Sequence, residues 1–179
     1  MNIKLRYSGL IEDDCTNGIG VCVSFWTQGC PHHCEGCHNK QTWDYSGGYE
    51  LPSNYIEYVW NSLHKFNVKR NLSILGGEPL CDQNYKIVYD LLKAIKLQDS
   101  SIKVFLWTGY TYEDLLDSYK KDILDFIDIL IDGKFELSKR DLTLWLKGSS
   151  NQRVIDLNKI RSDYSNVDLG ILNNIHKVG

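Results

Sequence analysis

Residues 20–37 read GVCVSFWTQGCPHHCEGC and join a short apolar segment to a cluster of cysteines. Residues 20–26 are rich in β-branched and aromatic side chains, which predicts a β-strand. Cys30, Cys34 and Cys37 follow within eight residues, with the spacing C-x3-C-x2-C. The sequence therefore predicts a strand that ends in a loop carrying three thiols.

Strand-like and helix-like segments alternate along the rest of the chain. Strands are predicted at 72–75, 102–107, 127–131 and 153–157, and amphipathic helices at 53–65 and 84–97. Ser53 is a candidate N-cap, and Thr111-Tyr-Glu-Asp114 has the form of a capping box that starts a third helix. Residues beyond about 158 are polar and weakly patterned. The alternation predicts an α/β fold of parallel strands joined by helical crossovers.

The length of the chain limits the number of these units. Each strand–helix–strand unit takes roughly 30 residues, so this chain holds about five or six of them. A complete eightfold barrel needs about 250 residues, more than the 179 present. We expect a single domain over residues 1–179, built as an open sheet or as a partial, open (β/α)6-type barrel of parallel strands.

Polar and glycine-rich turns follow several of the predicted strands. They are Cys30 after the first strand, Gly76-Gly77-Glu78 after the second, and Thr108-Gly109 and Asp132-Gly133-Lys134 after later ones. Ligands of parallel α/β folds bind at the carboxyl ends of the strands. We therefore expect one site assembled from segments that are far apart in the sequence.

The composition sets the broad class of the protein. With 42% hydrophobic and 24% charged residues, the chain has the composition of an ordinary soluble globular protein. No segment approaches the roughly 18 consecutive apolar residues of a membrane span, and the N-terminus lacks the apolar core of a signal peptide. Basic and acidic residues are interspersed and the net charge is −3, which gives no reason to expect nucleic acid. A cytoplasmic location is expected.

The six cysteines point to metal chemistry, because thiols in a cytoplasmic protein are kept reduced. Thiolates at Cys30, Cys34 and Cys37 can each bind one iron of a [4Fe–4S] cluster and leave the fourth iron without a protein ligand. An open coordination position is typical of a catalytic metal centre. The spacing therefore favours a cluster that binds a further ligand.

A structural zinc site is the alternative. His32, His33 or His38, or another cysteine, would have to complete the four ligands that zinc prefers. No second metal-spaced pair occurs in the chain, so the cluster is favoured. Cys22 fits a buried thiol within a strand, Cys15 and Cys81 are expected to have no role, and His32 and His33 are expected to be surface or loop residues.

With C-x3-C-x2-C after the first strand and Gly-Gly-Glu-Pro after the second, the chain resembles the radical S-adenosylmethionine (SAM) enzymes. Within them it is most similar to the activating proteins of anaerobic (class III) ribonucleoside-triphosphate reductase. The closer resemblance rests on residues 28–31, 34–39, 42–43, 76–80, 107–110, 132–135 and 148–152. Two positions depart from the family pattern: His38 replaces an aromatic Tyr or Phe, and Asn17-Gly18-Ile19-Gly20 replaces a Gly-Pro-Gly turn.

The resemblance implies a SAM site around the cluster, with SAM bound to the open iron through its amino and carboxylate groups. It places Gly76 and Gly77 beside the methionine amine, where Glu78 either complements the amine or fixes the loop. It places Thr108, Asp132, Gly133 and Lys134 near the methionine carboxylate, with Asp132 as a possible cation ligand. Gly36, Cys37 and His38 are implied next to the adenine, and residues 149–151 contact the ribose or cap a helix.

The resemblance also implies an activity and its partners. Reductive cleavage of SAM would give a 5′-deoxyadenosyl radical, which would generate a glycyl radical on the large subunit of the anaerobic reductase. Reduced flavodoxin or ferredoxin would supply the electron. A short, open barrel would leave room for a protein loop to enter the site. Tyr45, Tyr49 and Trp145 are candidates for the docking surface.

Three other functions compete with this one. They are an activase of another glycyl-radical enzyme, such as the pyruvate formate-lyase type; a radical SAM enzyme acting on a small molecule, such as carboxydeazaguanine synthase; and a zinc-stabilised binding module. The Trp-Thr-Gly-Tyr and Asp-Gly-Lys-Phe segments at 107–110 and 132–135 argue against the small-molecule enzyme.

Overall fold

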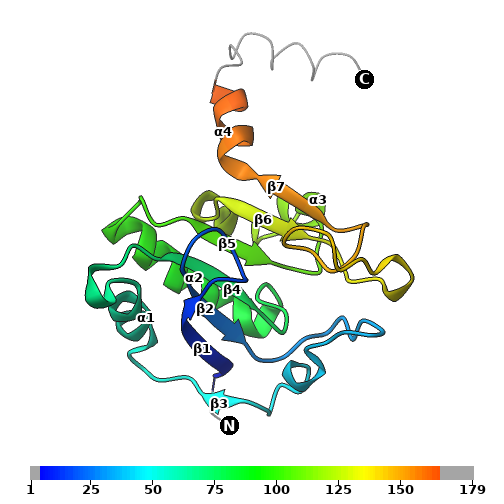
Figure 1. Cartoon of the computed structure of the whole chain (residues 1–179), viewed down its shortest axis with the longest axis horizontal. Helices are drawn as coiled ribbons and strands as arrows, with labels where there is room; N and C mark the ends of the chain where they lie inside the picture. Colours follow the sequence, from blue (N-terminus) through cyan, green and yellow to red (C-terminus); the bar gives the residue numbers. More distant parts are fainter. Residues whose placement is uncertain (1–4, 166–179) are drawn as a thin grey trace.

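The computed structural model describes residues 5–165 and shows a mixed α/β fold (Figure 1). Its strands are β1 (Arg6–Asp14), β2 (Cys22–Thr27), β3 (Tyr49–Glu50), β4 (Asn71–Gly76), β5 (Val104–Trp107), β6 (Ile129–Asp132) and β7 (Arg153–Asp156). Its α-helices are α1 (Tyr55–Leu63), α2 (Asp82–Gln98), α3 (Tyr112–Leu116) and α4 (Leu157–Ser165). Short 3-10 segments are η1 (Lys40–Thr42), η2 (Lys65–Asn67), η3 (Lys121–Phe126) and η4 (Leu137–Lys139). None of these helices is long and apolar enough to span a membrane.

The described strands form one seven-stranded sheet in the order β3-β1-β2-β4-β5-β6-β7. The central strands β2, β4, β5 and β6 are parallel to one another. β1 and β3 at one edge and β7 at the other pair in the antiparallel direction. The sheet is therefore mixed, and the (β/α)6-type partial barrel of parallel strands stays a prediction.

Two of the antiparallel strands, β7 and β1, differ from what the sequence indicates. β7 runs antiparallel to β6 because the connection between them contains a 3-10 turn and no crossover α-helix, so the chain re-enters the sheet from the end at which it left. β1 was not predicted; its residues are largely half-buried and follow no clear alternation of apolar and polar side chains.

The helix termini also differ in part from the predictions. The capping box at Thr111 is confirmed, since its side chain and that of Asp114 each accept a hydrogen bond from the other's backbone N–H. Ser53 is not the N-cap of α1, because that position is Asn54, whose side chain makes no capping bond. The residues from 166 onward lie outside the described part of the chain.

The two faces of the sheet have different coverings. Side chains that alternate along the parallel strands, such as Val23, Ile74 and Leu106, share one buried core with residues from all four α-helices. The side chains between them point to the other face, where Ser73 and Phe105 pack against the loop that follows β1. The long loops after β2 and β6 both project from the same end of the sheet (Figure 1). The helices thus cover one face and leave the other available for a site.

The carboxylate of Asp128 connects several elements through hydrogen bonds. Its carboxylate accepts hydrogen bonds from Lys96 Nζ (2.6 Å), the backbone N–H of Val104 (2.7 Å) and Asn158 Nδ2 (2.8 Å). Burial alone raises the pKa of Asp128, but these hydrogen bonds outweigh it and the net pKa falls below the ordinary 3.8. The ionised carboxylate therefore stabilises the junction of α2, β5 and α4.

Replacing Asp128 by Asn is expected to lower the free energy of unfolding by about 2 kcal/mol at neutral pH. Because the folded pKa is depressed, this stabilisation is complete above the unfolded pKa near 3.8 and is lost as the pH falls through the folded value. Urea unfolding at a series of pH values should show the gap between wild type and Asp128→Asn closing below pH 3.8. Asp125→Asn, at an exposed position nearby, should change stability by less than about 0.5 kcal/mol. A gap that stays constant with pH would contradict the assignment.

Candidate cofactor site

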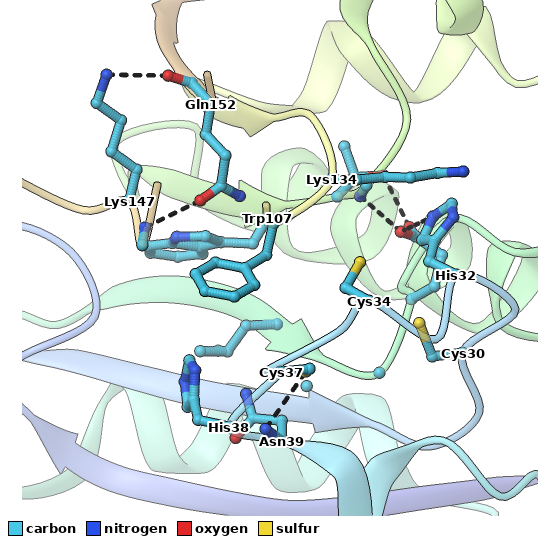
Figure 2. Close-up of a pocket in the computed structure, with 18 of the residues that line it drawn as sticks. Cys30, His32, Cys34, Cys37, His38, Asn39, Trp107, Lys134, Lys147 and Gln152 are labelled. Carbon is cyan, nitrogen blue, oxygen red and sulfur yellow. Dashed lines mark hydrogen bonds and ion pairs between the residues drawn. The ribbon is translucent and has the colours of Figure 1, made fainter. Parts of the chain in front are cut away.

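A cavity of about 370 Å³ lies at the carboxyl ends of the parallel strands. Trp26, Leu75 and Trp107 come from the neighbouring strands β2, β4 and β5 and line it on the face opposite the helices. Cys30, Cys34 and Cys37 all line the same cavity, and Figure 2 shows Trp107 across from them. The three thiols and the strand-end turns predicted to cooperate are therefore brought together.

Backbone hydrogen bonds fix the stem of the cysteine loop. The N–H of Gly29 donates to the carbonyl of Thr42 (2.7 Å), and the N–H of Cys30 donates to that of Trp43 (3.2 Å). Gly29 has a φ of +95°, and a Cβ on it would lie 2.1 Å from the ring of Tyr45. Only glycine fits there. Tyr45 is thus half-buried against the loop, and its place in a docking surface stays a prediction.

The three thiols form a donor set that suits an iron–sulfur cluster. The backbone N–H of Asn39 donates to Cys37 Sγ (3.4 Å), and such bonds to sulfur tune cluster potentials. Burial raises the pKa of Cys30 to about 11 and also raises that of Cys34, while backbone N–H groups directed at both sulfurs act in the opposite direction. No disulfide ties up these cysteines.

A single-metal site is not found in the same region. Within residues 5–165, no three His, Cys, Asp or Glu side chains are placed to hold one metal ion. Zinc requires its ligands to converge on one centre, whereas each thiolate of a cubane binds a different iron. The thiol arrangement is thus compatible with a cluster.

Gly76 and Gly77, at the end of β4, serve a purpose that the sequence did not reveal. A Cβ on Gly77 would lie 2.3 Å from the carbonyl oxygen of Gly29, and one on Gly76 would lie 2.6 Å from that of Thr27. The N–H of Gly77 donates to Thr27 (2.9 Å) and that of Glu78 donates to Gly29 (2.8 Å). The glycines therefore let this turn dock directly onto the stem of the cysteine loop.

Glu78 is 1% exposed and connects the loops around the cavity. Its Oε1 accepts from the N–H of Leu80 (2.8 Å) and from Thr108 Oγ1 (2.7 Å). Its Oε2 accepts from the N–H of Gly109 (2.7 Å) and contacts His32 Nε2 at 2.8 Å. Both oxygens are occupied by protein groups, so the geometry favours the loop-fixing role of Glu78 over contact with a bound amine. The Thr108 hydroxyl is likewise committed to Glu78.

His32 is the main site residue that the sequence did not identify. It was expected to be a surface or loop residue; it does lie in the loop, but its side chain is only 7% exposed and lines the cavity. Its ring also meets the edge of Tyr110, with centroids 4.8 Å apart. His33, its neighbour, points elsewhere and stacks on Trp43. No local pattern separates the two histidines, because the buried carboxylate that selects one of them, Glu78, comes from the turn after β4.

The turn after β6 is only partly as predicted. Gly133 and Lys134 line the cavity, and the Lys134 ammonium makes no ion pair with any described residue. Asp132 does not line it: its carboxylate is 1% exposed and is bound by Arg153 and by the backbone N–H of Tyr112 (2.7 Å). In this structure Asp132 joins β6, β7 and α3, and its contact with a ligand or cation stays a prediction.

Two further predicted contacts are changed by the structure. His38 lines the cavity, whereas Gly36 does not; a Cβ on Gly36 would lie 2.7 Å from the side chain of Leu137. Residues 149–151, predicted to contact the ribose or cap a helix, are not among the cavity-lining residues, and Asn151 Nδ2 donates to the carbonyl of Lys134 (2.8 Å). Gln152 Nε2 similarly donates to the carbonyl of Gly133 (2.9 Å). These residues brace the turn that carries Lys134.

The rest of the cavity wall was also missed by sequence reasoning. Thr16, Asn17, Leu144, Leu146 and Lys147 line it from the loops after β1 and η4. The indole N–H of Trp26, at the cavity wall, is buried and has no hydrogen-bond partner among the described residues. An unpaired donor there suits a ligand that carries an acceptor.

Comparison with known proteins first identifies the class of protein to which the chain belongs. Residues 16–155 match the family model described as a 4Fe-4S single cluster domain, which covers most of the chain. Three relatives are each called anaerobic ribonucleoside-triphosphate reductase-activating protein. The one from Vibrio cholerae is 36% identical over 149 residues, 83% of this chain and 96% of that protein. The one from Pasteurella multocida is 34% identical over 150 residues (83% and 95%), and that of Enterobacteria phage T4 33% over 150 residues (84% and 93%). The chain belongs to this family of activating proteins.

Proposed function

We propose that this protein is a radical SAM activase that generates a glycyl radical on the large subunit of anaerobic ribonucleoside-triphosphate reductase. The observation that carries the proposal is the meeting of Cys30, Cys34 and Cys37 with the Gly76-Gly77-Glu78 turn at one cavity. The family membership supports the same conclusion, because the relatives are named for activating that reductase. Reduced flavodoxin or ferredoxin is the proposed electron donor, and the cytoplasm the proposed location.

The cysteine loop would hold the cluster and leave one iron open for SAM. When bound, the cluster and SAM supply the hard chemistry, reductive cleavage to a 5′-deoxyadenosyl radical that takes a hydrogen atom from a glycine Cα. The protein supplies placement and the exclusion of water. The buried Cys30, the half-buried Cys34 and Cys37, and the tryptophans at the cavity wall serve that purpose.

Several side chains are available to hold SAM. Lys134 offers a charge to the methionine carboxylate, and its positive charge is near enough to Cys34 to favour the thiolate. The unpaired indole N–H of Trp26 offers a hydrogen bond to an acceptor on SAM. His38 lines the same cavity and is the proposed neighbour of the adenine. Glu78 and Thr108 are hydrogen-bonded to each other and hold the loops around this site in place.

The sheet itself is proposed to be a shortened radical SAM barrel. In a (β/α) barrel the helices pack outside and the ligand binds at the carboxyl ends of the strands. All four described α-helices contribute to a core on one face of the sheet, while the cavity is on the other. This division supports a barrel-like arrangement that has not closed.

Anaerobic reconstitution with iron and sulfide is the test of the proposal. The purified protein should gain a [4Fe–4S] spectrum, bind SAM, and release 5′-deoxyadenosine when reduced. Addition of the reductase large subunit should then produce a glycyl radical signal in electron paramagnetic resonance. A colourless protein that holds one zinc would overturn the cluster itself. Cleavage of SAM without a glycyl radical would point to a small-molecule substrate, and a radical on pyruvate formate-lyase alone would point to another activase.

A further inference from the structure

The side chain of His32 makes a contact that no other residue between the first two cysteines makes. Its Nε2 is 2.8 Å from Glu78 Oε2, and the two side chains are 7% and 1% exposed. Glu78 already accepts hydrogen bonds from backbone N–H groups on both oxygens. The carboxylate is therefore an acceptor, and His32 donates to it from Nε2–H.

The surroundings of His32 are shaped to hold the ring in this position. A Cβ on Gly109 would lie 2.4 Å from the imidazole, so only a glycine leaves room for it. The edge of the ring meets Tyr110, whose own ring has the Lys120 ammonium 5.0 Å from its centroid. His32 thus fits a slot formed by the turn after β5.

The partner of His32 is anchored on two strand ends. Glu78 follows β4, and through Thr108 and Gly109 it is bonded to the turn that follows β5. The loop between Cys30 and Cys34 makes no backbone hydrogen bond to either of these turns. Among the described residues, the side-chain hydrogen bond from His32 to Glu78 ties this part of the loop to the two turns.

We infer that His32 is a positioning residue: its hydrogen bond to the buried carboxylate of Glu78 fixes the loop between Cys30 and Cys34 against the ends of β4 and β5. The loop is thereby held in shape before any cofactor is bound. This inference rests on the proposed function for its consequence, which is that the cluster is retained and SAM meets it in one orientation. A charge-assisted hydrogen bond of this kind contributes about 1.5–3 kcal/mol, which corresponds to roughly 10- to 100-fold in an equilibrium.

The geometry of the bond provides a sharp set of variants. The amide nitrogen of Gln extends about as far from the backbone as Nε2 of His, whereas that of Asn reaches only the position of Nδ1. His32→Gln should therefore preserve the bond, while His32→Asn and His32→Ala should lose it. His33→Ala is the matched control, because His33 lies in the same loop and stacks on Trp43 without contacting Glu78.

Hydrogen exchange of the metal-free protein tests the inference directly. Backbone amides of residues 32–36 should exchange about 10-fold faster in His32→Ala and His32→Asn than in wild type. In His32→Gln and His33→Ala they should stay within about twofold of wild type. Equal protection in all five proteins would overturn the positioning role. Because this readout uses no cluster, it remains decisive even if reconstitution fails and the proposed function with it.

The reconstituted protein supplies a second readout. The rate at which a chelator removes iron should rise about 10-fold in His32→Ala and return to near the wild-type rate in His32→Gln. Addition of SAM should give a broadened or mixed electron paramagnetic resonance signal only in the variants that lose the bond. Iron loss and spectra identical to wild type in His32→Ala would contradict the inference. Faster loss in every variant, His33→Ala included, would contradict it too, because the effect would not depend on the bond from His32 to Glu78.

Discussion

Replacing Cys30, Cys34 or Cys37 by alanine is expected to lower SAM cleavage to background, a fall of roughly 1,000-fold or more, because the cofactors carry the chemical step. Each cysteine lines the cavity, and each is proposed to bind a different iron, so no neighbouring thiol replaces the lost one. The variants should also bind less iron after reconstitution. Iron and sulfide content and the yield of 5′-deoxyadenosine measure the two effects.

Cysteines outside the cavity provide the control for this experiment. Cys15 is exposed and is not among the residues that line the cavity, so Cys15→Ala should cleave SAM at the wild-type rate. Cleavage retained by any one of the three loop variants would contradict the assigned ligands. Loss of activity in Cys15→Ala as well would mean that the effect is not specific to the loop.

Glu78→Ala is expected to lower the free energy of unfolding of the metal-free protein by about 3–5 kcal/mol, because it leaves several buried donors without a partner. The groups affected are Leu80 N–H, Gly109 N–H, Thr108 Oγ1 and His32 Nε2. Glu78→Gln keeps one carbonyl acceptor, so it should lower the free energy of unfolding by less than Glu78→Ala does. Denaturant unfolding under reducing conditions, with a shift of midpoint at constant slope, provides the measurement.

Comparison with an exposed acid shows whether burial causes the effect. Glu35, in the cysteine loop, is exposed, and Glu35→Ala should change stability by less than about 0.5 kcal/mol. If Glu78 instead acted only on bound SAM, Glu78→Ala would weaken SAM binding and leave the stability of the metal-free protein unchanged. That outcome would contradict the loop-fixing role.

The cysteine loop illustrates what could be predicted from the sequence. The spacing C-x3-C-x2-C and the glycine-rich turns are local features, and their position after predicted strands indicated where they would meet. β2, β4, β5 and β6 occur where the pattern placed them, with ends shifted by up to two residues. Strand β1 was missed, since its half-buried residues show no regular alternation of apolar and polar side chains.

Asp132 and Gly36 illustrate what could not be predicted. Both lie in the motifs that resemble the family, yet neither lines the cavity. The carboxylate of Asp132 is instead bound by Arg153, which follows it by more than twenty positions and lies on the antiparallel strand β7. The direction of β7 depends on how the chain returns to the sheet, and no periodicity in the sequence encodes it.

The three thiols, their spacing and the turn after β4 were fixed by the sequence alone, because metal ligation and glycine turns depend on neighbours a few positions apart. Tertiary structure decided which polar side chains face the ligand and which hold the site together. Glu78 and His32 lie 46 positions apart and meet only when β2 and β4 pair in the sheet. A buried carboxylate must be satisfied by whatever donors surround it, and those donors are assembled by the fold.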